Sequence, residues 1–230
     1  GVRLGVLRAL VDTDDADPEV IALFEKALDD LRSAGAVIVD PFAIDNFADH
    51  LDADNFCVRF RYDMGQYLQS LGPDAPIKDV MEAYAAGQYS DYIKDGFEFF
   101  GSKPIDVHPE QAVPPCLDYP KHPGRKAFKD DIIKAMTDAN VSAILYPSWT
   151  NPPAFIDKAD EGYKGDNSQL VSPPSGLPAV TVPMGYSHGH LPAGLQMLGA
   201  PYSEGALIKY AYAYEQETKH RIPPPRFAGK

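Results

Sequence analysis

Two loops of this 230-residue chain carry the side chains best placed to bind a ligand. The first loop is YPSWTNPP, residues 146–153, and the second begins at Gly165 with GDNSQLVSPPSGLP. Loops this rich in Gly, Pro, Asn and Ser ahead of sheet strands leave backbone donors available, and binding sites are commonly built there. The polar and aromatic side chains of these loops include Trp149, Asn151, Asp166, Asn167 and Ser175.

The sequence carries none of the short motifs for covalent or phosphate chemistry. It has no GxSxG turn, no serine followed three residues later by lysine, no GxGxxG and no GxxxxGK[ST]. We therefore assign no catalytic residue to this chain. A weaker alternative is a triad assembled from Ser168 with His188 or His220.

Metal-ligand patterns are equally weak. His188 and His190 form an HxH pair in an expected hairpin turn, without a third ligand at suitable spacing, so a solvated turn is favoured over a metal site. The acidic residues of segment 12–17 lack the central Gly of a calcium loop, and Leu23 stands where a bidentate Glu would be needed. Helix capping by Asp17 explains them better, and no metal site is predicted.

Composition excludes several function classes. The formal net charge is −12, with 33 acidic and 21 basic residues, which argues against nucleic acid or an anionic membrane surface as partner. No apolar stretch approaches the ~20 residues that span a bilayer. The only cysteines, Cys57 and Cys116, are far apart and support neither a disulfide framework nor a zinc site, so a reducing cytoplasm is expected.

The chain opens at Gly1, without Met, directly in a strand-like run from Val2 to Val11. A polypeptide that begins inside an element is expected to have been cut from something longer. A processed start of a complete domain is the alternative.

The elements that position the loops begin with a βαβ pattern. The strand RLGVLRALV precedes Asp17-Pro18, which predicts an N-cap with proline at the first helical position. Apolar residues at spacings of three and four follow up to Gly35, and a second strand over 36–39 is expected to end at Asp40-Pro41. This pattern implies a sheet with helices packed on it.

The middle of the chain, about 42–140, is predicted to be a mainly helical excursion. Strands resume afterwards, at 143–146 and then as a hairpin formed by AVTVPMGY and LPAGLQMLG around the turn 187–190. A closing helix over 203–220 is expected, with Ser203 as its cap. The predicted helices and the loop of the excursion are 56–71, 77–86, 90–100, 125–139 and the Pro-rich loop 103–123.

Taken together, these segments resemble the C-terminal portion of the amidase signature family. The resemblance lies in SGLPAVTVPMG, LPAGLQMLG with Glu204 and Leu207, and the ending AYAYEQETKH. RLGVLRA, GAVIVDP, the helix FRYDMGQYLQSLGPDAP and the YPSWTNPP loop also have counterparts in the same order. The resemblance covers nearly all of the chain, and its specificity comes from the ordered set rather than from any one segment.

The resemblance implies a layered α/β fold around a large mixed β-sheet. It makes residues 1–230 the C-terminal portion of a single amidase-like α/β domain, hence an incomplete fold. The family hydrolyses amide C–N bonds with a Ser-Ser-Lys triad and needs no cofactor. Those three residues lie in the family's N-terminal part, which this chain lacks, so the chain alone is expected to be catalytically silent.

The resemblance also gives roles to the loop residues. Asp166 stands ten residues before Gly176, as does an acidic residue that holds the substrate's amino group in tRNA-dependent members of the family. The equally weighted alternative is an Asx turn made by Asp166 and Asn167. Trp149 and Asn151 line the same pocket by loop position, although Trp149 is as readily a core residue. Ser175 matches a pocket-lining position, so we reject a nucleophilic role for it.

Two functions follow from different classes. The leading hypothesis is the C-terminal part of an amidase acting on a small or peptide-like carboxamide, whose partners are the substrate and an N-terminal portion or complementary chain. The alternative is a non-catalytic binding or assembly subunit that has kept the fold. The first predicts an exposed apolar sheet edge with resulting self-association, so a homo-oligomer is left open.

Overall fold

The computed structural model describes residues 1–53 and 58–224. Phe56, where a helix was predicted to begin, and Cys57 lie outside the described residues. The chain forms two compact units: residues 1–53 with residues 124 onward, and the residues between them up to 123. Whether the whole chain is one portion of a single domain stays a prediction.

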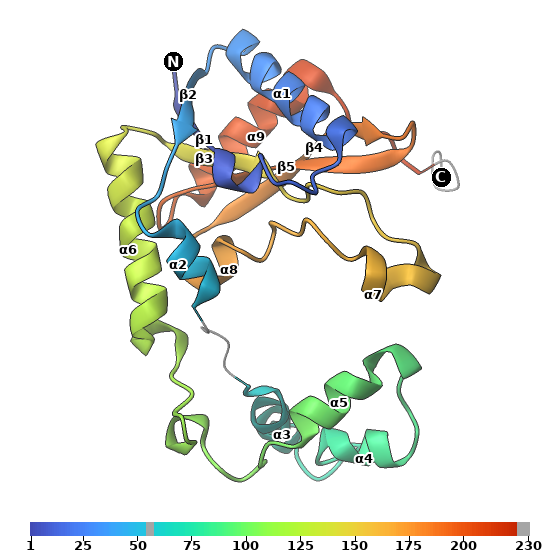
Figure 1. The fold of residues 1–230 in the computed structure, drawn as a ribbon. Helices are drawn as coiled ribbons and strands as arrows, with labels where there is room; N and C mark the ends of the chain where they lie inside the picture. Colours follow the sequence, from blue (N-terminus) through green and yellow to red (C-terminus); the bar gives the residue numbers. More distant parts are fainter. Residues whose placement is uncertain (54–57, 225–230) are drawn as a thin grey trace. The chain divides into compact units, whose positions relative to one another are not determined.

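A mixed five-stranded β-sheet, counted over the described residues, is the centre of the first unit (Figure 1). The strand order is β2-β1-β3-β5-β4. β1 pairs in parallel with β2 and β3, whereas β5 is antiparallel to β3 and β4. The predicted mixed α/β sheet and the predicted hairpin are thereby confirmed. The strands are β1 Arg3–Leu7, β2 Val37–Phe42, β3 Ala143–Pro147, β4 Ala179–Ser187 and β5 Leu191–Leu198.

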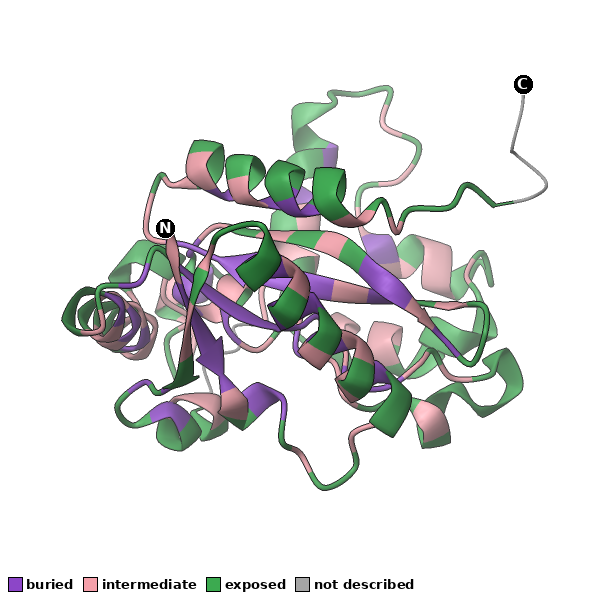
Figure 2. Cartoon of the chain, turned by 90° about the horizontal axis from the view of Figure 1, so that it is seen from above, coloured by how far each residue is buried: buried purple, intermediate pink, exposed green. Residues whose placement is uncertain are grey.

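Helices cover both faces of this sheet, which gives the layered arrangement expected. On one face, α1 and α9 bury Phe24 and Tyr214 against the strands. On the other face, α6 buries Phe128 and Ile132. Buried residues accordingly gather in the strands and on the inner sides of the helices (Figure 2). The helical elements of this unit are η1 Arg8–Leu10, α1 Pro18–Ser33, α2 Phe47–Asp52, α6 Pro123–Asp138, η5 Ile156–Lys158, α7 Ala159–Gly162, α8 Ser172–Ser175 and α9 Glu204–Thr218.

Helix α1 begins as its sequence predicts. The Asp17 carboxylate accepts hydrogen bonds from the backbone amides of Glu19 at 2.9 Å and Val20 at 3.1 Å, and Pro18 occupies the first helical position. Burial on its own would raise the pKa of Asp17, but hydrogen bonds from His188 and from these two amides outweigh it and lower the pKa. Within the acidic segment 12–17, Asp17 therefore serves as the helix cap.

Two details differ from the sequence expectation. Strand β2 does not end before Asp40-Pro41 but runs on to Phe42, because β2 is an edge strand and an edge can accept a residue without an amide donor. Ser203 does stand at the N-cap of α9, yet its hydroxyl makes no capping hydrogen bond. Its Oγ is buried and would lie 2.2 Å from a Cβ added at Gly199, so the hydroxyl points toward the end of β5 instead.

The second unit is mainly helical, while α2 and α6 belong to the first unit. Its ion pairs tie separate helices together: Arg61 of α3 donates to Asp79, the N-cap of α4, at 2.6 Å and to the carbonyl of Gly101 at 2.5 Å. The Pro-rich segment 103–123 is a loop with two short 3-10 turns. The elements are α3 Phe60–Ser70, α4 Val80–Ala85, η2 Asp91–Ile93, α5 Lys94–Gly101, η3 Pro109–Gln111 and η4 Tyr119–Lys121.

One cysteine corrects the sequence analysis. Cys116 is disulfide-bonded, whereas the sequence analysis found no support for a disulfide framework because the two cysteines are far apart in the chain. Sequence separation does not decide pairing, since a fold brings distant cysteines within the short Cα distances that a disulfide needs. The argument for a reducing compartment from cysteine usage therefore loses its support.

The Asp17 cap gives a first prediction. Replacing Asp17 by Ala leaves two helix amides without their acceptor and should lower the free energy of unfolding by about 1 kcal/mol. Asp17→Asn keeps a side-chain oxygen at the cap and should lose less. Urea denaturation followed by circular dichroism measures both variants. Equal losses in the two variants would contradict capping as the main role of this side chain.

Candidate functional site

The candidate site is built where the chain leaves the buried strand β3. Ser148 donates its backbone amide to the carbonyl of Gly194 on β5 at 2.8 Å, which prolongs the sheet by one residue. The two loops singled out in the sequence then pair with each other. Trp149 and Asp166 form an antiparallel bridge, flanked by backbone hydrogen bonds from Thr150 to Gly165 at 2.8 Å and from Asn167 to Ser148 at 3.0 Å.

Asn167 anchors this loop pair to the sheet. Its buried side-chain amide donates to the carbonyl of Leu10 at 2.7 Å and to that of Pro147 at 2.9 Å. These carbonyls lie just beyond the carboxyl end of β1 and at the end of β3. Both donors of the amide are therefore occupied within the chain, and the side chain holds three segments together rather than facing a ligand.

Asp166 presents an ionised carboxylate surrounded by local donors. Oδ1 accepts the Ser168 amide at 3.0 Å and its hydroxyl at 2.5 Å, while Oδ2 accepts Tyr163 at 2.7 Å and Gln169 at 2.6 Å. Burial alone would raise the pKa of Asp166, but these hydrogen bonds outweigh it and lower the pKa. The bond from the Ser168 amide is the Asx turn that the sequence offered as the alternative.

Tyr163 joins the acid to the aromatic part of the site. Its hydroxyl donates to Asp166, and its ring meets Trp149 edge-on, with ring centroids 5.1 Å apart. The Asp166 carboxylate raises the pKa of this phenol through that hydrogen bond. Trp149 itself is half-buried, so it belongs to a surface site rather than to the core.

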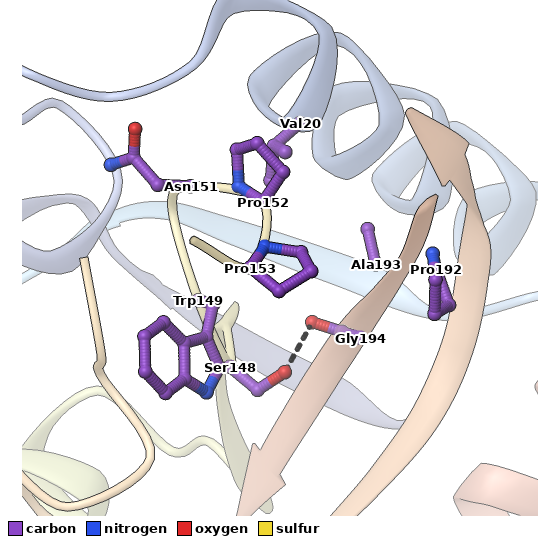
Figure 3. Close-up of a pocket in the computed structure, with 9 residues that line it drawn as sticks. All are labelled: Val20, Ser148, Trp149, Asn151, Pro152, Pro153, Pro192, Ala193 and Gly194. Atoms are coloured by element: carbon purple, nitrogen blue, oxygen red, sulfur yellow. Dashed lines mark hydrogen bonds between the residues drawn. The ribbon is translucent and has the colours of Figure 1, made fainter. Parts of the chain in front are cut away.

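A pocket of about 240 Å³ opens beside these residues (Figure 3). It lies between the first turn of α1, the loop after β3 and the beginning of β5. The proline rings point into the space between these elements, whereas the Asn151 amide points away from them and donates to Thr150 Oγ1 at 3.2 Å. The lining residues are Val20, Ser148, Trp149, Asn151, Pro152, Pro153, Pro192, Ala193 and Gly194.

Close backbone packing shapes this pocket at two glycines. Gly165 has φ of +77°, a left-handed conformation that other residues rarely adopt, and a Cβ there would lie 2.3 Å from Thr150 Oγ1. A Cβ at Gly194 would lie 2.4 Å from Ser148 Oγ. Instead, that hydroxyl donates to the Gly194 carbonyl at 3.1 Å. The two loops approach each other closely at Gly165, and the first loop approaches β5 closely at Gly194, because neither glycine carries a side chain.

His188 ties two walls of the pocket together. It lies in the β4–β5 turn, with its imidazole 2.9 Å from Asp17 and 3.4 Å from Glu19, at the first turn of α1. The hydrogen bond with Asp17, together with the charge of Glu19, raises the pKa of His188 above its ordinary value of 6.5. The contact between His188 and Asp17 joins the turn before Pro192 to α1, the helix that carries Val20.

The remaining candidates have structural partners. Ser175 is fully buried in α8 and donates its hydroxyl to the carbonyl of Val171 at 2.6 Å. The alternative triad is not assembled, because Ser168 donates to Asp166, His188 binds Asp17, and His220 lies 3.8 Å from Asp30. Over residues 1–53 and 58–224, no cluster of three or more His, Cys, Asp or Glu could hold a metal ion. No helix in that part of the chain is long and apolar enough to cross a membrane.

The structure therefore brings Trp149, Asn151, Asp166 and Asn167 into one loop pair and leaves Ser175 in a separate buried turn. The sequence analysis did not find Tyr163, Gln169 or the far wall made by Val20 and Pro192. Val20 is one of the apolar residues after Pro18 whose spacing of three and four predicts a helix. Only the close approach of α1 to the hairpin turn brings it beside the loop.

Comparison with known proteins places the chain. The family model described as Amidase matches residues 1–208. A glutamyl-tRNA(Gln) amidotransferase subunit of Bartonella bacilliformis is 32% identical over 220 residues, which are 86% of this chain and 41% of that protein. The corresponding protein of Moorella thermoacetica is 28% identical, over 97% of this chain and 46% of that protein. The chain thus spans less than half the length of these curated relatives.

Solved structures agree in fold. The peptide amidase from Stenotrophomonas maltophilia superposes with a TM-score of 0.69 at 24% identity, over 97% of this chain and 44% of that one. An amidase family protein from Bacillus anthracis superposes with a TM-score of 0.67 at 21% identity, over 97% of this chain and 40% of that one.

The double anchor of Asn167 yields a stability prediction. Asn167→Ala leaves the carbonyls of Leu10 and Pro147 buried without donors and should lower the free energy of unfolding by on the order of 3 kcal/mol. Asn151→Ala removes one 3.2 Å hydrogen bond to an adjacent residue and should cost less than about 1 kcal/mol. Urea denaturation monitored by Trp149 fluorescence compares the two. Similar losses would contradict the anchoring role.

The His188 pair yields a pH prediction. Because folding raises the pKa of His188, its stabilising contribution is fully present below the unfolded pKa of about 6.5 and is lost as pH rises through the folded value. The stability difference between the native chain and His188→Asn should therefore shrink as pH increases above 6.5. Denaturation curves at several pH values test this. The same comparison in an Asp17→Asn background, where the imidazole has lost its carboxylate partner, is the control and should show a smaller trend.

Proposed function

Because the chain belongs to the amidase family, we propose that it is the C-terminal part of an enzyme that hydrolyses a carboxamide C–N bond. The substrate is a small or peptide-like amide, and water is added across its acyl C–N bond to give a carboxylic acid and ammonia or an amine. The observation that carries the proposal is the family match over residues 1–208, since it includes both loops of the candidate site.

The nucleophile and its proton relay are supplied, in this proposal, by an N-terminal portion that is covalently joined or present as a separate chain. The match to less than half the length of the relatives supports this.

An open sheet edge is consistent with a covering segment. β4 is the last strand of the sheet in the described residues, and Thr181 and Pro183 on it are exposed. Unpaired edges readily accept a further strand. The exposed edge residues are small rather than strongly apolar, so additional strands would pair mainly through the backbone.

Asp166 binds the substrate in this proposal. Its carboxylate is ionised at neutral pH and can accept from an ammonium or amide N–H group. All of its strong acceptor positions are already used by internal donors, so the substrate must displace one of them. The exposed Gln169 amide at Oδ2 is the donor most easily replaced, since its side chain lies at the surface.

The partners proposed are the amide and the complementary polypeptide, in keeping with relatives that are named as a subunit. No cofactor enters the proposal, because serine chemistry needs none. Binding of nucleic acid or membrane is not proposed, and homo-oligomerisation stays an open prediction. A cytoplasmic location also stays a prediction.

The test compares the recombinant chain with tagged chain recovered under native conditions from its host. The recombinant chain should release no ammonia from carboxamides, and recovered material should do so. A fluorophosphonate should label a serine outside residues 1–230. Within the active material, Asp166→Asn should lower kcat/KM by at least about tenfold, equivalent to about 1.4 kcal/mol, whereas Asp160→Asn, on exposed α7, should leave it unchanged.

Two results would decide against the proposal. Ammonia release by the recombinant chain that survives replacement of both Asp166 and Ser175 would remove the need for an N-terminal portion. Recovered material that binds carboxamides without turnover would instead favour the non-catalytic binding subunit.

A further inference from the structure

The pocket beside Trp149 is lined without a charged side chain. Its polar groups are engaged elsewhere: the Ser148 hydroxyl donates to the Gly194 carbonyl, and the Asn151 amide donates to Thr150 and points away from the prolines (Figure 3). The surfaces that remain for a ligand are the Trp149 indole, proline rings and small apolar side chains. A group entering this space therefore meets apolar surface and few free hydrogen-bonding atoms.

The size of the pocket limits what it can take. Pockets that enclose a whole drug-sized molecule usually measure about 300–1,000 Å³, and this one measures about 240 Å³. It holds one side group of a ligand, with the rest of the ligand outside. Burying an aliphatic or aromatic side chain of that size contributes about 1.5–3 kcal/mol, whereas an ionised group there would lose its hydration without gaining a counter-charge.

The pocket is formed before a ligand arrives. Pro152, Pro153 and Pro192 have restricted backbones, and the loop that carries the first two is bound to β5 and to the segment after Gly165 by backbone hydrogen bonds. Little conformational entropy is therefore lost when a ligand binds.

A short chain of contacts connects this pocket to the acid. The Trp149 ring, which lines the pocket, meets the Tyr163 ring, and the Tyr163 hydroxyl donates to Asp166. A ligand whose apolar group fills the pocket would thus carry its amide or amino group toward the carboxylate side of the same loop pair.

We propose that this pocket takes the uncharged apolar side group of the carboxamide substrate, a single aliphatic or aromatic group, and selects against substrates that are anionic at that position. This inference rests on the proposed amidase function and names its substrate class. In this inference the uncharged residues that line the pocket select the substrate, and no charged side chain takes part in the selection.

The test uses the single tryptophan of the chain as a local reporter. The 230-residue chain is titrated with phenylacetamide, with phenylacetate, which has the same ring but a negative charge, and with acetamide, which has the amide but no ring. Phenylacetamide should change the Trp149 fluorescence saturably, and its Kd should be at least about tenfold lower than that of either of the others. Excitation at the red edge keeps the tyrosine contribution small.

Two glutamate substitutions that add the same negative charge, one at the pocket and one away from it, extend the test. Pro153→Glu places a carboxylate at the exposed rim of the pocket and should weaken phenylacetamide binding at least about tenfold. Ile208→Glu, on the exposed side of α9, adds the same charge outside the pocket lining and should leave binding unchanged. Circular dichroism and a denaturation curve establish that both variants are folded.

Equal affinity for phenylacetamide and phenylacetate would overturn the proposal, as would the absence of a saturable signal or an unchanged Kd in Pro153→Glu. The titration involves no turnover, so its failure concerns the pocket alone, whereas the amidase proposal is judged by ammonia release and serine labelling.

Discussion

The buried amide of Asn167 is the contact on which the candidate site depends. A loop of more than twenty residues between β3 and β4 loses much conformational entropy on taking one shape, and this loss must be offset by contacts. Two hydrogen bonds from one side chain fix that loop to the ends of two parallel strands. With this point fixed, the bridge between Trp149 and Asp166 follows from backbone pairing, and one side of the pocket is set by it.

The site separates two kinds of recognition in space. Asp166 lies in a dense set of local donors, which keeps its charge stable and makes any ligand compete for an acceptor position. The pocket along the same loop has few unused polar atoms and is lined mainly by apolar surface. In the function proposed here, the pocket supplies affinity and the Asp166 carboxylate supplies orientation, a division that is common in enzyme sites.

Much of this arrangement is predictable from the sequence, because its signals are local. The Asp17-Pro18 cap, the apolar spacing of α1 and the hairpin around 187–190 are each encoded within a few residues, and the structure has all three. Strand β2 was predicted too short, because proline at a sheet edge carries no sequence mark that distinguishes it from proline ending a strand. Tyr163 and Val20 were missed as site residues since their roles arise only when distant segments meet. The likeness to a family indicated Asp166 but could not show that its lone pairs are already occupied.

The exposed position of β4 has a consequence for how the state of this protein can be observed. Along an edge strand, alternate amides point toward the neighbouring strand and toward solvent, so their hydrogens exchange at very different rates. In β4 the amides facing β5 are protected by pairing, while those on the outer side depend on whatever covers the edge. The exchange pattern between Ala179 and Ser187 thus distinguishes a covered sheet from an uncovered one, without any knowledge of the covering segment.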